Sequence, residues 1–327
     1  MFRNGNFAAW SCGVLSAVLA VGAWESVPLR AEDAIEKAAA SKSGDVKSTD
    51  VKPADATLLL PRRIGRLDWH TDYATAYRAA LTGKRLLLLV FRDAGPSGDR
   101  FEAEVLARPE LEPALKNIER AAIPTTATVV TSTTDPHAKP AVLLQTSSFA
   151  YLYGGAGIAV LDLASDKSPT FGQVISAHAF SGRQAYGVQA VETILTLPAG
   201  TVTQRALVYA MRMHPERPQS VWGSAHPVLM QHARLSSQLM VQYGSVGHHD
   251  WGNRLSQIGS QAGLSPFEVA ASSYGASPLV DAASELVQNW RGSPAHWGGM
   301  SSPQRHFGYD MVQGPSGIWY GTGLFAN

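Results

Sequence analysis

A chain of 327 residues, 45% of them hydrophobic, is long enough for one large domain or two ordinary ones. Its net charge of +1, with only 16% charged residues, excludes the broad basic surface that nucleic-acid binding requires. Cys12 is the single cysteine and lies in the N-terminal apolar run. A mature chain without that run therefore has no disulfide, cysteine metal site or catalytic thiol.

The N-terminus has the features of an export signal. Arg3 precedes an almost wholly apolar run from Phe7 to Val21, and Val21-Gly-Ala23 or Leu29-Arg-Ala31 offers a cleavage site with small residues. We therefore expect residues 1–31 to be a cleaved signal peptide and the mature protein to be periplasmic or extracellular. The alternative is an uncleaved membrane anchor, because the apolar stretch is close to the shortest length that spans a bilayer.

Residues 32–57 form a predicted linker. They are mostly Ala, Lys, Asp, Glu, Ser and Thr, with no aromatic residue. Such a composition cannot bury enough apolar surface to offset the entropy lost on ordering. We expect a disordered tether between the signal and the folded part of the chain.

The elements predicted for residues 58–197 indicate a small α/β sandwich. Apolar residues at helical spacing predict a helix over Trp69–Leu81. The unbroken apolar run Leu86–Phe91 is typical of a strand that is buried on both faces. A loop and a helix from about Arg100 follow, and then strands at Ile158–Asp162 and Gly172–Ser176. A central strand flanked by helices and later strands predicts helices packed on a sheet.

Two stretches of this half resemble a thioredoxin-like domain: Gly83-Lys84-Arg85-Leu86, which opens the central strand, and Asp93-Ala94-Gly95-Pro96-Ser97, which follows it. Thioredoxins carry Trp-Cys-Gly-Pro-Cys in that loop, so Gly95 and Pro96 match while Ala94 and Ser97 occupy both thiol positions. We place Ala156 where thioredoxins have the proline that faces the motif. Thiol–disulfide exchange needs one thiolate to attack and a second thiol to resolve. The resemblance therefore implies a redox-inactive domain.

Residues 198–224 are predicted to connect two domains. Thr201–Met213 has apolar residues at helical spacing, and the helix should stop before Pro215. His214-Pro-Glu-Arg-Pro218 then gives a link that is stiffened by two prolines.

Residues 225–327 predict an α-β-α layering. The expected elements are helices at Pro227–Tyr243 and Leu279–Trp290, a helix at or just after Glu268, and strands at Phe307–Met311 and Ile318–Thr322. His248 and His249 lie in the turn after the first helix, and His296 lies just past the end of the last one.

Three motifs in this half, taken in order, resemble the bacterial branch of the CAP superfamily, the SCP or pathogenesis-related-1 domain. They are Gly247-His248-His249-Asp250-Trp251, Ser265-Pro-Phe-Glu268-Val-Ala and Trp290-Arg-Gly-Ser-Pro-Ala-His296-Trp297. The resemblance implies a cleft lined by His248 or its neighbour His249, by Glu268 and by His296. The whole chain is thus expected to be a thioredoxin-like α/β domain followed by an α-β-α sandwich CAP domain.

Two positions depart from the family pattern. Val269 replaces an asparagine, and Ser293 stands where a second glutamate is common. Glu285, one helical turn earlier, is the nearest substitute for that glutamate. Arg254 is expected to be solvated surface. The aromatic residues of this half are expected to form core and cleft wall; they are Trp251, Trp290, Trp297, Trp319 and Tyr320.

Two imidazoles and one carboxylate can act in three ways. His248, Glu268 and His296 can hold zinc or a similar divalent cation with one position open for water. Glu268 can instead raise a histidine pKa and make a metal-free acid–base pair. The three residues can also form a buried polar network that fixes the helices to the sheet. We expect an exported binding protein for an extracytoplasmic protein, lipid or cell-envelope polymer, with a metal-assisted hydrolase as the alternative.

Overall fold

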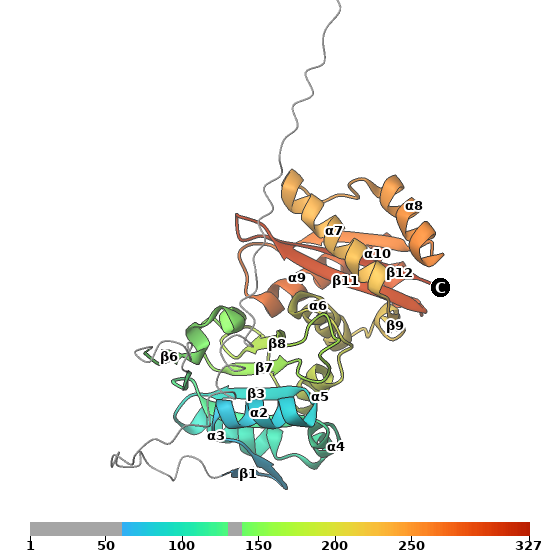
Figure 1. Cartoon of the computed structure of the whole chain (residues 1–327). Helices are drawn as coiled ribbons and strands as arrows, with labels where there is room; N and C mark the ends of the chain where they lie inside the picture. Colours follow the sequence, from blue (N-terminus) through green and yellow to red (C-terminus); the bar gives the residue numbers. More distant parts are fainter. Residues whose placement is uncertain (1–60, 130–138) are drawn as a thin grey trace, which may run out of the picture.

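The computed structural model describes residues 61–129 and 139–327, so the predicted signal peptide and linker lie outside the described residues. Figure 1 shows one sheet in each half of the chain, with helices on the outer faces and between the sheets. Each of these two sheets has four strands. The predicted α/β fold is confirmed.

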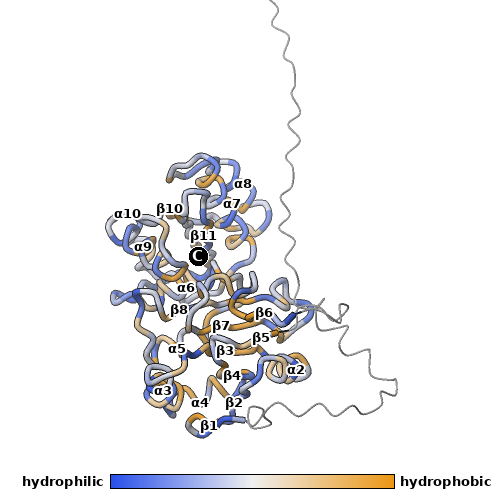
Figure 2. Tube along the Cα trace, turned by 90° about the vertical axis from the view of Figure 1, so that its left-hand side faces the viewer, coloured by the Kyte–Doolittle hydropathy of each residue, from blue (hydrophilic) through white to orange (hydrophobic). Residues whose placement is uncertain are grey.

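The first sheet has the strand order β4-β3-β7-β8. Its strands are β3 (Leu87–Arg92), β4 (Glu119–Pro124), β7 (Gly157–Leu161) and β8 (Val174–Ala179). β3 pairs parallel with β4 and antiparallel with β7, and β7 pairs antiparallel with β8. The first five residues of β3 are all buried, as the unbroken apolar run predicted, because both faces of the strand are covered. Figure 2 shows the hydrophobic colouring along β3 and β7.

Helices cover both faces of this sheet. α2 (Tyr73–Gly83) begins at Asp72, whose carboxylate accepts the N–H of Thr75, and ends at Lys84 in the left-handed region. The helix expected from about Arg100 begins earlier, at Pro96, because proline suits the first helical position. The other helices of this half are α3 (Pro96–Phe101), the π-helical turn Glu102–Leu106, α4 (Glu112–Lys116) and α5 (Val188–Leu195), with 3₁₀ turns at Pro109–Leu111, Leu143–Gln145 and Ser147–Leu152. Two small hairpins complete it: β1 (Arg62–Ile64) with β2 (Leu67–Trp69), and β5 (Thr128–Val129) with β6 (Ala141–Val142).

α6 (Val202–Met213) is the central helix of the molecule. The side chain of Thr201 accepts the N–H of Gln204, and the side chain of Gln204 accepts the N–H of Thr201, so a capping box starts the helix. Residues 203–211 are all buried. α6 packs on β8 of the first sheet and on β11 of the second, and lies between the two sheets in Figure 1. Residues 198–224 therefore supply core to both halves as well as connecting them.

Arg205 of α6 is a buried cation that donates four hydrogen bonds. Its Nε donates to the hydroxyl of Ser176 at 2.7 Å. Its terminal nitrogens donate to the carbonyls of Ile194, Leu197 and Pro198 at 2.8–2.9 Å. Ile194 lies in the last turn of α5, and Leu197 and Pro198 follow that helix, so Arg205 caps α5 from the next helix. Burial lowers the pKa of Arg205 to about 10, which leaves it charged at neutral pH.

The second sheet has the order β10-β12-β11-β9. Its strands are β9 (Ser224–Ala225), β10 (Phe267–Ser272), β11 (His306–Gln313) and β12 (Trp319–Ala326). One face carries α7 (Pro227–Tyr243) and α8 (Trp251–Ala262), and the other carries α6, α9 (Leu279–Arg291) and α10 (Pro294–Ser301). α7 lies so close to β11 that a Cβ at Gly308 would stand 2.2 Å from the carbonyl carbon of Leu229. The layering is α-β-α, as expected.

One expectation about this half was wrong. Glu268 lies on strand β10 and not at a helix, because Phe267–Ser272 pairs along its whole length with β12. His296 lies past the end of α9, as expected, but within a further short helix, α10, which Pro294 starts and which was not predicted. The helix α8, between His249 and Glu268, was not predicted.

Candidate functional site

The turn between α7 and α8 turns His248 toward the sheet. Gly244, in the left-handed region, ends α7 by donating its N–H to the carbonyls of Met240 and Val241. Asp250, also left-handed, starts α8. Nδ1 of His248 lies 2.8 Å from Oε1 of Glu268. An ionised carboxylate only accepts hydrogen bonds, so Nδ1 carries the proton and Nε2 remains available to a ligand.

Arg254 of α8 holds Glu268 from the other side. Two guanidinium nitrogens donate to the two carboxylate oxygens, Nη2 to Oε1 at 2.9 Å and Nη1 to Oε2. Nε donates to the carbonyl of His249 at 3.0 Å, which ties the turn to the same cation. The side chains of Arg254 and Glu268 are only 4% and 2% exposed. The expectation that Arg254 is solvated surface was therefore wrong.

Arg254 is the functional residue that sequence reasoning missed, although the sequence held a signal for it. Trp251, Arg254, Leu255 and Ile258 recur at positions i, i+3, i+4 and i+7. This spacing puts Arg254 on the same helix face as the buried Ile258. A cation on an apolar helix face needs a buried anion, and Glu268 is that anion.

The pKa of Glu268 lies below its usual range. Burial by itself raises the pKa, but the hydrogen bonds from Arg254 and His248 and their charges outweigh the burial. Glu268 is therefore ionised at neutral pH, and its charge is balanced by Arg254. The Arg254–Glu268 ion pair therefore holds His248 in place and carries no net charge.

His296 approaches His248 from α10. The ring centroids lie 6.2 Å apart with an angle of 69° between the planes. Burial, and then the neighbouring His248, lowers the pKa of His296. His296 is therefore neutral at neutral pH. The His248 side chain is 46% exposed, so this pair of imidazoles faces solvent while the carboxylate beneath it does not.

The segment after α6 holds α10 in place. Glu216 accepts the indole N–H of the Trp297 ring at 2.8 Å and the Nε–H of Arg291 at 2.5 Å. The ring of His214 packs edge-on against Trp297, with 4.8 Å between ring centroids. Trp297 neighbours His296 in sequence, so these contacts fix the helix that carries the second imidazole.

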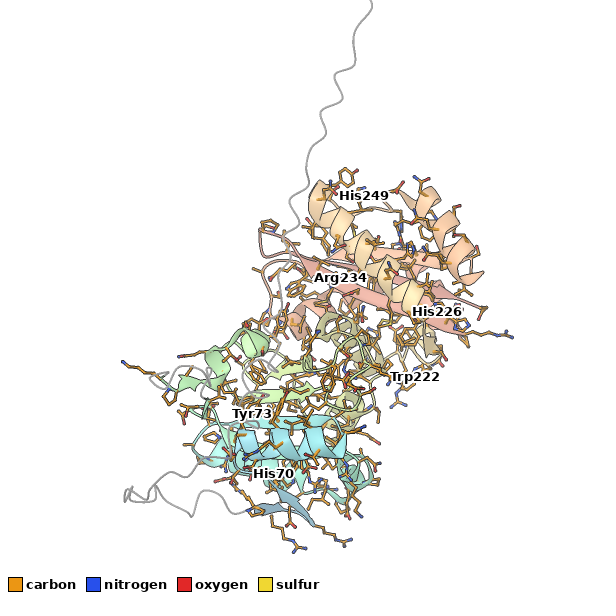
Figure 3. All side chains as sticks on the ribbon, in the orientation of Figure 1. His70, Tyr73, Trp222, His226, Arg234 and His249 are labelled. Carbon is orange, nitrogen blue, oxygen red and sulfur yellow. The ribbon has the colours of Figure 1, made fainter. Side chains whose placement is uncertain are left out.

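His249 points away from the site. Its Nε2 donates to the carbonyl of Ser245 at 3.0 Å, and its ring packs on Tyr243 with 4.6 Å between centroids. Figure 3 labels His249 beside the C-terminal end of α7. Of the two neighbouring histidines, His248 is the one that meets Glu268 and His296.

The residues present do not fit the predicted zinc site. Within residues 61–129 and 139–327 no group of three or more His, Cys, Asp or Glu side chains could hold a metal ion. The guanidinium of Arg254 already contacts both oxygens of Glu268, and a second cation there would be repelled. The assignment of His248, Glu268 and His296 as metal ligands is corrected accordingly.

The other singled-out positions lie elsewhere. Ala94, Pro96 and Ser97 are exposed at the start of α3, and Gly95 lies between them at φ 138°. Glu285 does not reach the site, because its carboxylate accepts the N–H of Tyr274 and the hydroxyl of Ser277. The aromatic residues are buried or half-buried, as expected for core and wall: Trp251, Trp290, Trp297, Trp319 and Tyr320.

Comparison with known proteins finds one weak structural similarity among the matches and no family. No family model matches the chain, and no curated protein matches it. Among solved structures, an outer surface protein from Borrelia burgdorferi is similar at 15% identity and a TM-score of 0.27, over 32% of this chain and 77% of that one. In the part of the chain that the structure describes, no helix is long and apolar enough to cross a membrane.

Proposed function

We propose that residues 225–327 form a CAP-like binding cleft that recognises its ligand through His248 and His296 without catalysis. One observation carries the proposal: both oxygens of Glu268 are engaged by Arg254 and His248. A carboxylate held in this way orients an imidazole and is not free to accept a proton from substrate or water. The ligand-facing polar groups are then two imidazoles at fixed positions, which suits hydrogen bonding to a polar ligand group.

The order of the motifs and the layering support the CAP-like assignment. The three motif segments place His248, Glu268 and His296 on three different elements that meet at one site. In the first half, a parallel pair followed by two antiparallel strands supports a thioredoxin-like module. Its thiol positions hold Ala94 and Ser97, so we propose a binding or scaffolding role for it and no redox role.

We also propose that the protein is exported and that its ligand is a protein, a lipid or a polymer of the cell envelope. The support is the N-terminal apolar run with its small-residue cleavage sites, which lies outside the described residues. A hydrolase is the second candidate. The observation that favours it is the Nδ1 hydrogen bond of His248 to Glu268, the arrangement that orients a histidine base.

The test compares two histidines that are neighbours in sequence. Purified mature protein is sedimented with phosphatidylglycerol-containing vesicles and, separately, with peptidoglycan sacculi. We expect wild type to bind one of the two probes, and His249→Ala to bind that probe as tightly as wild type does. His248→Ala and His296→Ala should bind it at least about tenfold more weakly.

Two results would contradict the proposal. In the first, a probe binds wild type and all three variants equally well. In the second, the protein turns over a nitrophenyl ester at a rate that falls in His248→Ala but not in His249→Ala, which would establish the hydrolase instead. Thermal melting of each variant checks that a loss of binding is not a loss of folding.

A further inference from the structure

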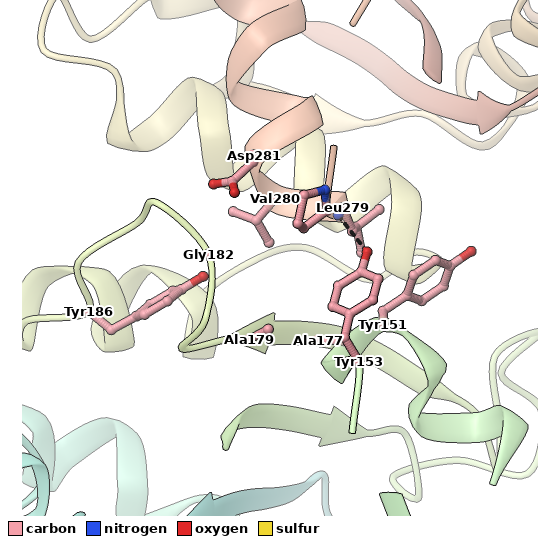
Figure 4. Close-up of a pocket in the computed structure, with 10 residues that line it drawn as sticks. Tyr151, Tyr153, Ala177, Ala179, Gly182, Tyr186, Leu279, Val280 and Asp281 are labelled. Atoms are coloured by element: carbon pink, nitrogen blue, oxygen red, sulfur yellow. Dashed lines mark hydrogen bonds between the residues drawn. The ribbon is translucent and has the colours of Figure 1, made fainter. Parts of the chain in front are cut away.

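A hollow between the two halves of the protein combines aromatic rings with a buried carboxylate (Figure 4). Tyr151 and Tyr153 line it from the end of a 3₁₀ segment, and Gly182 and Tyr186 from the loop after β8. Asp281, in the first turn of α9, closes it from the second half. The hollow lies apart from the His248–His296 site and does not depend on the function proposed for that site.

The walls of this hollow are fixed across the junction of the two halves. The hydroxyl of Tyr153 accepts the N–H of Leu279, the first residue of α9, at 2.8 Å. The side-chain amide of Gln184 donates to the hydroxyl of Ser284 at 3.1 Å. A site between two parts that are held in this way is formed before a ligand arrives.

The charges at the junction do not balance. Asp281 and Glu285 have side chains only 4% and 7% exposed, and Arg183 is the cation that contacts both of them. Glu285 has further donors in the N–H of Tyr274 and the hydroxyl of Ser277. Asp281 accepts one backbone N–H, that of Arg183, at 3.1 Å to each oxygen, and the guanidinium stays 3.7 Å away.

The negative charge of Asp281 is therefore only partly compensated where the carboxylate faces the hollow. The start of α9 offsets part of that charge through its helix dipole. Arg234 and Asp310, which act electrostatically on Tyr151, form an ion pair with each other at 3.8 Å. Asp281 and Glu285 share the guanidinium of Arg183, so a second cation next to Asp281 is favoured.

The shape of the hollow selects the kind of cation. It contains about 220 Å³ of space including its open mouth, and the enclosed part holds about one water-sized group. Gly182 makes the approach to Asp281 possible, because a Cβ there would lie 3.3 and 3.5 Å from its carboxylate oxygens. The lining includes tyrosine rings, and an aromatic ring attracts a positive charge that lies over its face. An ammonium group matches this space, and a quaternary ammonium or a guanidinium exceeds it.

We propose that this hollow binds a primary ammonium group at the end of a flexible chain, such as that of a lysine side chain. The ammonium donates to Asp281 and lies against the rings of Tyr153 and Tyr186, and its alkyl stem leaves through the mouth. Two features select the ligand: the carboxylate of Asp281 requires a positive charge, and the small enclosed space beside Gly182 admits only a small group.

The experiment uses n-butylammonium as the probe and the amide signals of Gly182 and Arg183 in ¹H–¹⁵N NMR spectra of the purified protein as the readout. We expect saturable shifts of both signals at millimolar n-butylammonium. Tetramethylammonium, n-butanol and sodium at equal ionic strength should leave them unchanged. Equal shifts with tetramethylammonium or sodium would overturn the proposal, as would no shift with n-butylammonium.

Two variants test the residues. Gly182→Ala keeps every charge and fills the space next to Asp281, and Asp281→Asn removes the charge. Both should weaken binding of n-butylammonium at least about tenfold. The control Asp166→Asn removes an exposed carboxylate of the first half and should bind like wild type. Unchanged binding in a folded Gly182→Ala protein would overturn the proposal even if Asp281→Asn fails to fold.

Discussion

Replacing Arg254 by methionine tests the central pair of the candidate site. The change removes both donors to Glu268 and the donor to the carbonyl of His249, and it leaves the buried carboxylate with His248 alone. Removing one partner of a buried ion pair costs about 3–5 kcal/mol because the other charge remains buried. For a folded region of this size, that loss lowers Tm by roughly 6–20 °C.

The pH dependence of the loss identifies its cause. In wild type the pKa of Glu268 is lowered, so its contribution to stability is present above the unfolded pKa and is lost as pH falls through the folded value. Without Arg254, burial raises that pKa above its usual range. The deficit of Arg254→Met should therefore be largest near pH 7 and should shrink as pH falls toward about 4.

Urea unfolding at several pH values measures both effects. Arg291→Met is the matched control, because it removes a half-exposed partner of Glu216 and should cost far less. Adding Glu268→Leu to Arg254→Met removes the stranded charge and should restore more than half of the lost stability. A loss below about 1 kcal/mol in Arg254→Met, or a deficit that does not change with pH, would refute the reasoning.

Three further predictions concern the core and the first half. Burial, and then the charge of Arg205, lowers the pKa of His178 to about 3. At this residue the unfolded chain therefore binds more protons than the folded chain, and the free energy of unfolding of wild type should fall by about 2 kcal/mol between about pH 7.5 and 5. His178→Leu should flatten that part of the pH profile measured by urea unfolding. Gly308→Ala pushes α7 away from β11 and should cost about 3 kcal/mol or more, whereas Gly252→Ala, with open space around it, should be neutral in the same thermal melts. The natural chain should reduce no insulin disulfide with any electron donor, and Ala94→Cys with Ser97→Cys should introduce measurable turbidity in that assay.

The long periodic elements were predictable from sequence. The helix Pro227–Tyr243 agrees with the prediction at both ends, because Pro227 and Gly244 mark a start and a stop. The strand at Leu87–Arg92 was equally clear. The short segment after Pro266 was assigned to the wrong element, because six residues of mixed polarity are too few to separate a strand from a helix by their periodicity. Pairing with β12, about 50 residues later, decides in favour of the strand.

The site was predictable in part. The motif order indicated Glu268 and His296, but the choice between His248 and His249 depends on the left-handed turn at Asp250, which the sequence does not reveal. The ion pair with Arg254 depends on a contact across 14 residues between a helix and a strand. The polar residues of α6 are a similar case. Thr203 and Gln204 are buried because they donate to Asp310, more than 100 residues away.

The position of α6 sets an order for the folding of the nascent chain. The ribosome completes every strand of the first sheet by residue 179, but the inner face of β8 is covered only when α6 has emerged. The side chains of Thr203 and Gln204 in the first turn of α6 gain their hydrogen-bond acceptor still later, because Asp310 is translated close to the end of the chain. The first half therefore leaves the ribosome with an unfinished core, and almost the entire protein must be translated before either half is sealed.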